Sequence, residues 1–100
     1  MAQHVGIRLF NEIELDWSRS ELYPTNVARA LPAFDDQRYP LLRSVDPYGD
    51  TIFSSHQMDG LLAELESRLK ETGDASLGEV IAAGERCKAR IGSWLIFIGD

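Results

Sequence analysis

Apolar and charged residues alternate along the first part of the chain, from Val5 to Trp17. The apolar residues of this run are Val5, Ile7, Leu9, Ile13, Leu15 and Trp17, and the charged ones are Arg8, Glu12, Glu14 and Asp16. A period of two predicts a β-strand with one buried and one solvent-facing side. Asn11 interrupts the apolar side and Phe10 the polar side. Because the run is also long for one strand, we expect a bulge or bend near Phe10–Glu12.

Residues 18–40 show no regular hydrophobic period and contain three prolines. Thr25 is placed to cap one short helical turn that extends to Leu31. Four apolar side chains, which we expect to hold the segment against the body of the protein, are Tyr23, Leu31, Phe34 and Tyr39. Long connections of this kind often carry function or are loosely ordered.

Two strand-like stretches, Leu41–Val45 and Thr51–Ser54, flank the tetrapeptide Asp46-Pro47-Tyr48-Gly49. Asp, Pro and Gly at its first, second and fourth positions are typical of a type I turn. Proline presets φ, the aspartate side chain accepts backbone N–H groups, and Gly49 is suited to a positive φ. The pattern predicts a β-hairpin turned at Asp46–Gly49.

An amphipathic helix is expected directly after this hairpin. Ser54 and Gln57 have the spacing of a capping box, and Gly73 marks the C-terminal end. The apolar stripe at helical spacing comprises Met58, Leu61, Leu62, Leu65 and Leu69. On the opposite side, Glu64 with Arg68 and Glu66 with Lys70 are spaced for ion pairs one helical turn apart.

A second helix follows, with a Ser76–Glu79 capping box at its start and Gly92 at its end. The residues predicted to face inward are Leu77, Val80, Ile81, Cys87 and Ile91. Gly84 lies on the same stripe, so we expect a close approach to a neighbouring element there. The final stretch, Ser93–Ile98, is apolar on both sides, which predicts a buried central strand.

Together these elements predict a single α+β domain over residues 1–100. The order is strand, loop, hairpin, helix, helix and strand. The simplest arrangement has two layers, with two consecutive amphipathic helices on one face of an about four-stranded sheet that is mostly antiparallel or mixed.

Composition and length predict the number of domains and the cellular compartment. A chain of 100 residues that is 44% hydrophobic and 26% charged has the balance of one globular domain. Its longest apolar run, Trp94–Ile98, is far shorter than a membrane span, and the N-terminus has no signal-peptide pattern. The single cysteine, Cys87, cannot form an internal disulfide. These features predict a cytoplasmic protein without membrane contact.

The formal net charge is −6, and acidic residues crowd the first part of the chain. Such a charge repels phosphate backbones, so general nucleic-acid binding is not expected. An acidic face attracts a basic protein partner, but it also serves solubility alone, and the sequence leaves both interpretations open. A late basic group, Arg86, Lys88 and Arg90, complements the dipole at a helix C-terminus or docks an anion.

We expect no catalytic residue, no cofactor and no metal site. The two histidines, His4 and His56, are not accompanied by clustered ligands. Ser54 and His56 are close in sequence, but adjacency does not assemble a nucleophile with its base, and Ser54 already has a capping role. Cys87 falls on the apolar stripe of its helix and is interpreted as a core thiol.

Aromatic residues at the surface are the better functional signal, because interfaces favour Tyr, Trp and Arg. Tyr48 occupies the third position of the turn, which does not require an aromatic residue. Trp17, Tyr23 and Tyr39 flank the long loop and alternatively form a small satellite core beneath it. The predicted partner-binding residues are Tyr48, Asp50, Arg43, Tyr23, Asp35 and Asp36.

The stretch Tyr39–Phe53, with its VDPYGDT motif, and the closing LIFIGD at Leu95–Asp100 resemble a set of small bacterial proteins that have no assigned function. The resemblance covers the hairpin, the first helix and the last strand. It implies a bacterial or phage-associated cytosolic protein and brings no catalytic residues with it. In size and acidity the chain is also similar in general character to toxin-immunity and inhibitor proteins.

The leading hypothesis is therefore a non-catalytic interaction protein of the immunity or inhibitor kind, which docks a protein through an acidic face and exposed aromatics. The alternative is a small-ligand-binding or enzymatic module with a site between residues 18–40 and the sheet, using Asp46, Asp50, His56 or Arg43. A third hypothesis is self-association through the long N-terminal strand as an open sheet edge.

Overall fold

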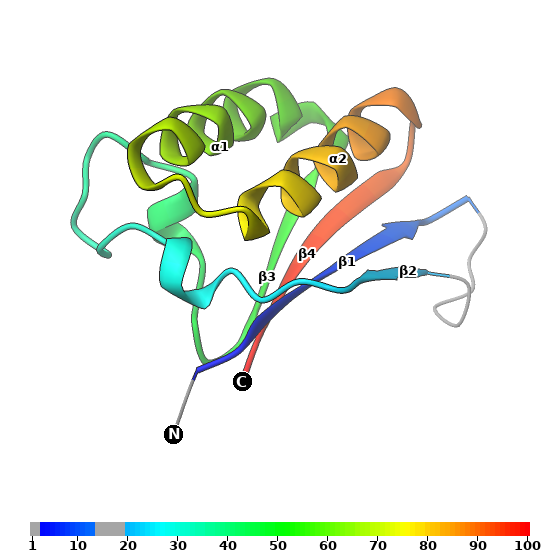
Figure 1. The fold of residues 1–100 in the computed structure, drawn as a ribbon. Helices are drawn as coiled ribbons and strands as arrows, with labels where there is room; N and C mark the ends of the chain where they lie inside the picture. The colour runs from blue at the N-terminus through cyan, green and yellow to red at the C-terminus, as the bar shows by residue number, and fades with distance from the viewer. Residues whose placement is uncertain (1–2, 14–19) are drawn as a thin grey trace.

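The computed structural model describes residues 3–13 and 20–100. Its strands and α-helices are β1 (Val5–Asn11), β2 (Glu21–Tyr23), β3 (Asp50–Ser54), α1 (Met58–Thr72), α2 (Ser76–Ala89) and β4 (Ser93–Gly99) (Figure 1). Short 3₁₀ helices lie at Ala28–Ala30, Leu42–Ser44 and Ser55–Gln57. The strand order is β2-β1-β4-β3, and each neighbouring pair is antiparallel. The predicted α+β class with a four-stranded sheet is confirmed. Among the described helices, none is both long and apolar enough to cross a bilayer.

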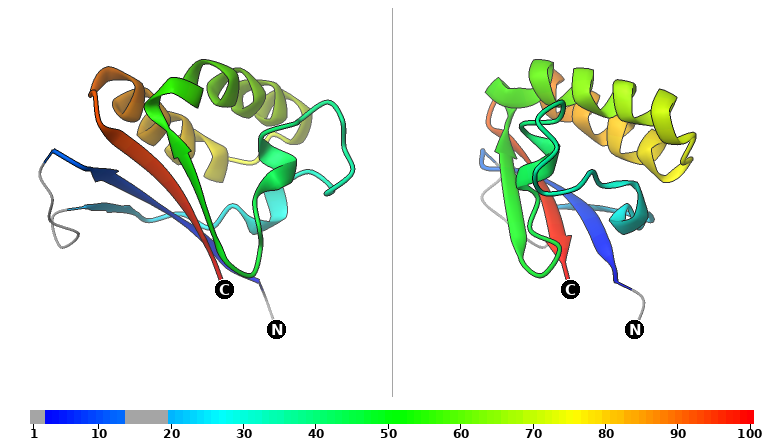
Figure 2. Two further views of the ribbon diagram at one scale, coloured as in Figure 1. Left: turned by 180° about the vertical axis from the view of Figure 1, so that it is seen from behind. Right: turned by 90° about the vertical axis from the view of Figure 1, so that its left-hand side faces the viewer.

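Both α-helices lie on the same face of the sheet, which gives the predicted two layers (Figure 2). The core between them is built from Val5, Ile7, Leu9, Phe53, Leu95 and Phe97 of the sheet and Met58, Leu61, Leu65, Leu77, Val80 and Cys87 of the helices. Phe53 and Phe97 meet edge to face, with ring centroids 5.6 Å apart. The two helices approach closely at Gly84, where a Cβ would lie 2.8 Å from Cδ2 of Leu62. The expected close approach at this glycine is confirmed.

Strand β4 is central, as its two apolar sides predicted. It pairs with β1 on one side and with β3 on the other. Strand β1 ends at Asn11, where Glu12 and Ile13 form a turn near the expected bend, and the predicted continuation through Trp17 lies outside the described residues. Because β1 lies between β2 and β4, the hypothesis of association through β1 as an open edge is wrong. The two edges of the sheet are β2 and β3.

The predicted hairpin is wrong, although its turn is present. Leu41–Val45 is not a strand, because the 3₁₀ helix Leu42–Ser44 occupies it. The carboxylate of Glu64 accepts the backbone N–H groups of Leu41 and Leu42 at 3.0 Å, so helix α1 fixes the start of this 3₁₀ helix. Strand β3 therefore pairs with β4 instead of with the segment that precedes it. The expected Glu64–Arg68 ion pair is also wrong, since Arg68 pairs with Glu71.

Residues 20–40 contain the strand that sequence periodicity missed. Strand β2 pairs with β1, placing Leu22 opposite Arg8. The short helical turn is present at Ala28–Ala30, but Thr25 does not cap it, and its hydroxyl donates instead to the carbonyl of Ser76. Phe34 was expected to anchor this segment, but its side chain is 85% exposed.

The turn at Asp46–Gly49 forms as predicted, with one difference at its glycine. The N–H of Tyr48 donates to Oδ1 of Asp46 at 2.8 Å, and the N–H of Gly49 donates to the Asp46 carbonyl at 3.4 Å. Gly49 does not have a positive φ, contrary to expectation. Glycine leaves room there for the Asp46 carboxylate, because a Cβ would lie 2.8 Å from its Oδ2 and this side chain would have to shift.

The helix ends are partly as predicted. Ser54 and Gln57 form the expected capping box, and Gly73 ends α1 with φ of 66°. The Ser76–Glu79 box is wrong, because Oδ1 of Asp74 accepts both the N–H and the hydroxyl of Ser76, at 3.0 and 2.7 Å. These bonds lower the pKa of Asp74. Helix α2 ends at Ala89, before Ile91, whose side chain is 85% exposed and does not face the core as predicted.

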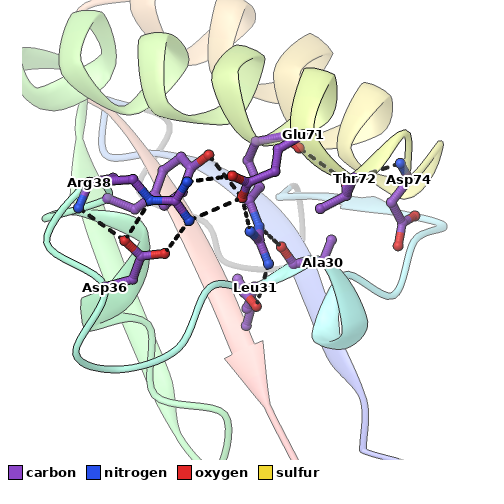
Figure 3. A network of polar contacts seen from close by, with 9 residues as sticks. Ala30, Leu31, Asp36, Arg38, Glu71, Thr72 and Asp74 are labelled. Atoms are coloured by element: carbon purple, nitrogen blue, oxygen red, sulfur yellow. Dashed lines mark hydrogen bonds and ion pairs between the residues drawn. The ribbon is translucent and has the colours of Figure 1, made fainter.

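A polar network ties residues 30–39 to α1 (Figure 3). Arg68 donates to the carbonyls of Ala30 and Leu31, at 2.7 and 3.2 Å. Glu71 accepts from Arg38, from Arg68 and from the hydroxyl of Tyr39. The guanidinium groups of Arg38 and Arg68 also lie 5.3 and 5.5 Å from the centre of the Tyr39 ring. Tyr39, which is 2% exposed, is therefore the aromatic anchor of this segment.

Candidate protein-binding face

The side of the sheet that faces away from both helices carries a second set of apolar residues. The open face, as we call it, comprises Phe10, Leu22, Ile52, Trp94, Ile96 and Ile98. Strand pairing places Phe10 opposite Trp94 and Ile52 opposite Ile96. These positions alternate along their strands with the core residues, because successive side chains of a strand point to opposite faces. No helix of the described chain covers this face (Figure 2).

A shallow hollow lies at the centre of the open face. Its lining consists of Phe10, Ile52, Trp94 and Ile96, and its volume is about 330 Å³. Ile96 is only 4% exposed at the floor, whereas Ile52 is 55% exposed beside it. Isolated exposed apolar residues are ordinary on soluble proteins. An apolar surface that continues across β1, β4 and β3 is instead typical of an interaction site.

Polar groups border this apolar surface. At one end the indole N–H of Trp94 donates to Oε2 of Glu12 at 3.2 Å. Arg8 lies within the open face, because it pairs with Ile96 on one side and with Leu22 on the other, and its Nη1 donates to the hydroxyl of Ser20 at 2.6 Å. At the other end Asp50 and Asp100 are exposed. Within the part of the chain that the structure describes, Asp50 has no ion-pair partner. The open face therefore has an apolar centre, acidic residues at its two ends and the cationic Arg8 between β4 and β2.

Three of the predicted partner-binding residues lie toward the end of the molecule where β3 begins. Tyr48 is 77% exposed in the turn, as its position predicted, and Asp50 starts β3 on the open face. Arg43 is exposed on the 3₁₀ helix Leu42–Ser44. It borders a separate hollow of about 250 Å³, which is lined by Gln3, Ala28, Leu31, Pro32, Phe34, Arg43, Val45 and Pro47.

The other three predicted residues lie elsewhere. Tyr23 is on edge strand β2, where its hydroxyl contacts Glu21 and Arg86, and burial raises its pKa. Asp35 is exposed. Asp36 belongs to the network on α1, and its hydrogen bond with Arg38 lowers the pKa of this carboxyl to about 2. Of the six predicted residues, Tyr48 and Asp50 thus lie near each other at the start of β3, and the others are spread over the surface.

The residues considered for catalysis or ion binding do not converge. Cys87 is buried, and burial raises the pKa of its thiol to about 11, which suppresses the reactive thiolate. Arg86 pairs with Glu21 and Lys88 with Asp59, each at 2.6 Å. Among the described residues, no group of three or more His, Cys, Asp or Glu side chains is placed to hold a metal ion.

Sequence reasoning missed the open face, although its signal was present. Ser93–Ile98 was expected to be a buried central strand, and Ile96 is 4% exposed as predicted, but Trp94 and Ile98 on the same side are only partly buried because the helices cover the other face (Figure 2). Trp94, Ile96 and Ile98 had to emerge on the other face, opposite Phe10 and Ile52. Searches against family models, curated proteins and solved structures find no match.

Proposed function

We propose that the chain is a non-catalytic protein-interaction module that binds a partner protein on the open face. The observation that carries this proposal is an apolar sheet surface around Phe10, Ile52, Trp94 and Ile96, with no described helix over it. Covering such a surface with protein is favourable by about 25 cal/mol for each Å² of apolar area removed from water. In biological terms we propose an immunity or inhibitor-type protein of the bacterial cytoplasm.

The side chains of the open face indicate which kinds of residue a partner needs at its binding surface. Its centre accepts an apolar projection beside Ile52, and Trp94 is an aromatic side chain of the kind that dominates binding energy in interfaces. Glu12 at one end and Asp50 at the other favour a partner with Lys or Arg at its rim. The formal net charge of −6 adds long-range attraction, which raises the association rate of a basic partner at low ionic strength.

Site-specific photo-crosslinking in the host tests this proposal. Replacing Ile52 by a photoreactive benzoylphenylalanine should trap one discrete partner, whereas the same replacement of Ile91 should not. Ile91 is a matched control because it is 85% exposed and lies outside the open face. Equal adducts from both positions, or none from position 52, would contradict the proposal.

Affinity measurements with the purified partner then distinguish specific binding at the open face from non-specific association. Ile52→Glu places a charge against the apolar contact and should weaken binding by at least about tenfold, because burying an unpaired charge is costly. Ile91→Glu adds the same charge elsewhere and should leave the dissociation constant within about twofold. Equal weakening by both variants would indicate a non-specific charge effect and overturn the assignment of the open face.

The alternative function is a small-ligand-binding or enzymatic module. Its support is the hollow of about 250 Å³ between residues 28–34 and 43–47, where Arg43 is positioned to meet an anionic group. Thermal-shift screening of small carboxylates and phosphates tests it, since a ligand that binds only the folded state raises the melting temperature with concentration. A concentration-dependent rise that Arg43→Ala abolishes would favour this alternative over the open face.

A further inference from the structure

The outer edge of β3 offers unpaired backbone groups beside the open face. Hydrogen bonds of an antiparallel ladder link alternate residue pairs. The N–H of Gly99 donates to the carbonyl of Gly49 at 2.8 Å, so the bonded pairs continue at Thr51 with Phe97 and at Phe53 with Leu95. The backbone N–H and C=O groups of Asp50 and Ile52 therefore point away from β4, toward the edge.

Nothing in the described chain occupies this edge. The preceding segment approaches β3 from the helix side, where the N–H of Asp46 donates to the hydroxyl of Thr51 at 2.8 Å. At the far end the N–H of Ser54 is taken by Oε1 of Gln57 at 2.9 Å. The available edge is thus the stretch from Asp50 to Ile52, whose side chains at both ends lie on the open face.

The two edges of the sheet differ in their protection against strand pairing. Natural edges are blunted by short length, proline, lysine or bulges. Strand β2 has three residues, is followed by Pro24, and has Glu21 held by Arg86. The available stretch of β3, Asp50–Ile52, is no longer than β2, but it contains Ile52 and the strand has no proline, glycine or lysine. The unprotected edge is the one that adjoins the hollow on the open face.

We propose that the partner binds by strand addition: an extended segment of a basic protein pairs with β3 as a fifth strand of the sheet. Backbone bonds to Asp50 and Ile52 supply affinity, and alternate side chains of the added strand supply specificity. An apolar side chain of the added strand lies next to Ile52 and extends the apolar surface of the open face. A Lys or Arg of the same strand forms an ion pair with Asp50. This inference rests on the proposed function, because the added strand and the open face form one surface.

A second copy of the chain is a poorer occupant of the same edge. Pairing two β3 strands brings together two chains that each carry a formal charge of −6. Such self-repulsion opposes association. An extended segment with Lys or Arg instead gains from the same charge.

Selection from a displayed library of random peptides of about 12 residues tests the inference, since strands are usually no longer than about 10 residues. Enriched peptides should alternate apolar residues with Lys or Arg. Their binding should slow hydrogen exchange at the Ile52 amide by at least about tenfold, because this N–H becomes hydrogen-bonded. The Phe53 amide points to β4 and serves as the internal control, protected with or without peptide.

Other outcomes separate this inference from the proposed function. Peptides that bind and are lost in Ile52→Glu, but leave the Ile52 amide unprotected, overturn strand addition and leave docking on the open face standing. Protection of that amide in the chain alone, with a doubled mass by light scattering, makes a second copy the occupant and overturns the inference. If no peptide is enriched and position 52 gives no adduct in the host, both proposals fail.

Two variants at one position test the backbone bond itself. Ile52→Pro removes the outward N–H and is tolerated by an edge strand whose N–H faces solvent. Ile52→Thr keeps the N–H and the β-branched shape. Strand addition predicts that Ile52→Pro weakens peptide binding at least about tenfold more than Ile52→Thr. Equal weakening by two variants whose melting curves show a folded state would overturn strand addition.

Discussion

The side chain of Glu64 on α1 accepts the backbone N–H of Leu41 with both carboxylate oxygens, at 3.0 and 3.1 Å. One of these oxygens also accepts the N–H of Leu42 at 3.0 Å. A carboxylate from one helix thus caps the start of another, where N–H groups have no partner within their own helix. Because Leu42 is 1% exposed, this bond positions a core residue as well as the chain that leads to β3.

Removing this cap should destabilise the fold. Glu64→Ala leaves two backbone N–H groups without their acceptor, and we expect the free energy of unfolding to fall by about 1–2 kcal/mol. Urea denaturation measures the change. Glu66→Ala, at an exposed position of the same helix, is the control and should stay within about 0.5 kcal/mol of the native protein. Equal effects of the two variants would show that Glu64 acts only as a surface charge.

The contacts of Glu64 are of a kind that the sequence pattern alone does not predict. The helical spacing of Glu64 and Arg68 predicted a local ion pair, but both side chains bind distant backbone groups. Leu41–Val45 has the composition of a strand, and only the contact with α1 makes it a 3₁₀ helix. Local patterns contain no information on such long-range capping, so the hairpin was mistaken while the helix beside it was predicted correctly.

Strand β2 illustrates a second limit. Glu21–Tyr23 is too short to show a period, and its pairing with β1 determines its conformation. By contrast, α1, α2 and β4 have periodic or continuous apolar patterns, and these elements were predicted within a few residues. In the candidate site, exposure of Tyr48 followed from the turn. The open face depends on which side of the sheet the helices cover, so it required the three-dimensional arrangement.

Arg68 should be more important for stability than its place on a helix surface suggests. Its side chain is 15% exposed, and the guanidinium donates to the carbonyls of Ala30 and Leu31 while pairing with Glu71. Arg68→Ala should lower the free energy of unfolding by about 1–3 kcal/mol, because acceptors in partly buried positions lose their donor. Arg68→Lys should recover only part of this free energy, since an ammonium lacks the planar guanidinium that donates to several acceptors at once. A calorimetric comparison with exposed Lys70→Ala tests this, and equal losses would contradict it.

The same network makes stability depend on acid pH. Hydrogen bonding to Arg38 lowers the pKa of Asp36 from 3.8 to about 2 and also lowers the pKa of Glu71. Each carboxyl thus has a lower pKa folded than unfolded, so the unfolded chain binds more protons in this range. The contribution is present above the unfolded pKa values and is lost as pH falls toward about 2.

Urea midpoints at about pH 5 and about pH 2.5 measure this loss. The native protein should show a lower midpoint at the acid value. The double variant Asp36→Asn with Glu71→Gln removes both titrating groups and should reduce the difference. Salt should weaken the effect, because both groups are near the surface and their interactions are screened. An unchanged difference in the double variant would assign the acid sensitivity to other carboxyls.

Gly99 and Gly78 should respond in opposite directions to the same substitution. A Cβ on Gly99 would lie 2.5 Å from the carbonyl carbon of Pro47, whereas a Cβ on Gly78 meets nothing within 4 Å. Gly99→Ala therefore forces the backbone of the turn away from β4, and we expect a loss of about 1–3 kcal/mol. Gly78→Ala places a better helix former in α2 and should add about 0.5–1 kcal/mol.

The turn also leads into Asp50, so Gly99→Ala should weaken peptide binding at the β3 edge while Gly78→Ala leaves it unchanged. Denaturation and peptide titration of both variants test the pair, and an equally stable Gly99→Ala protein would show that the turn can shift without cost.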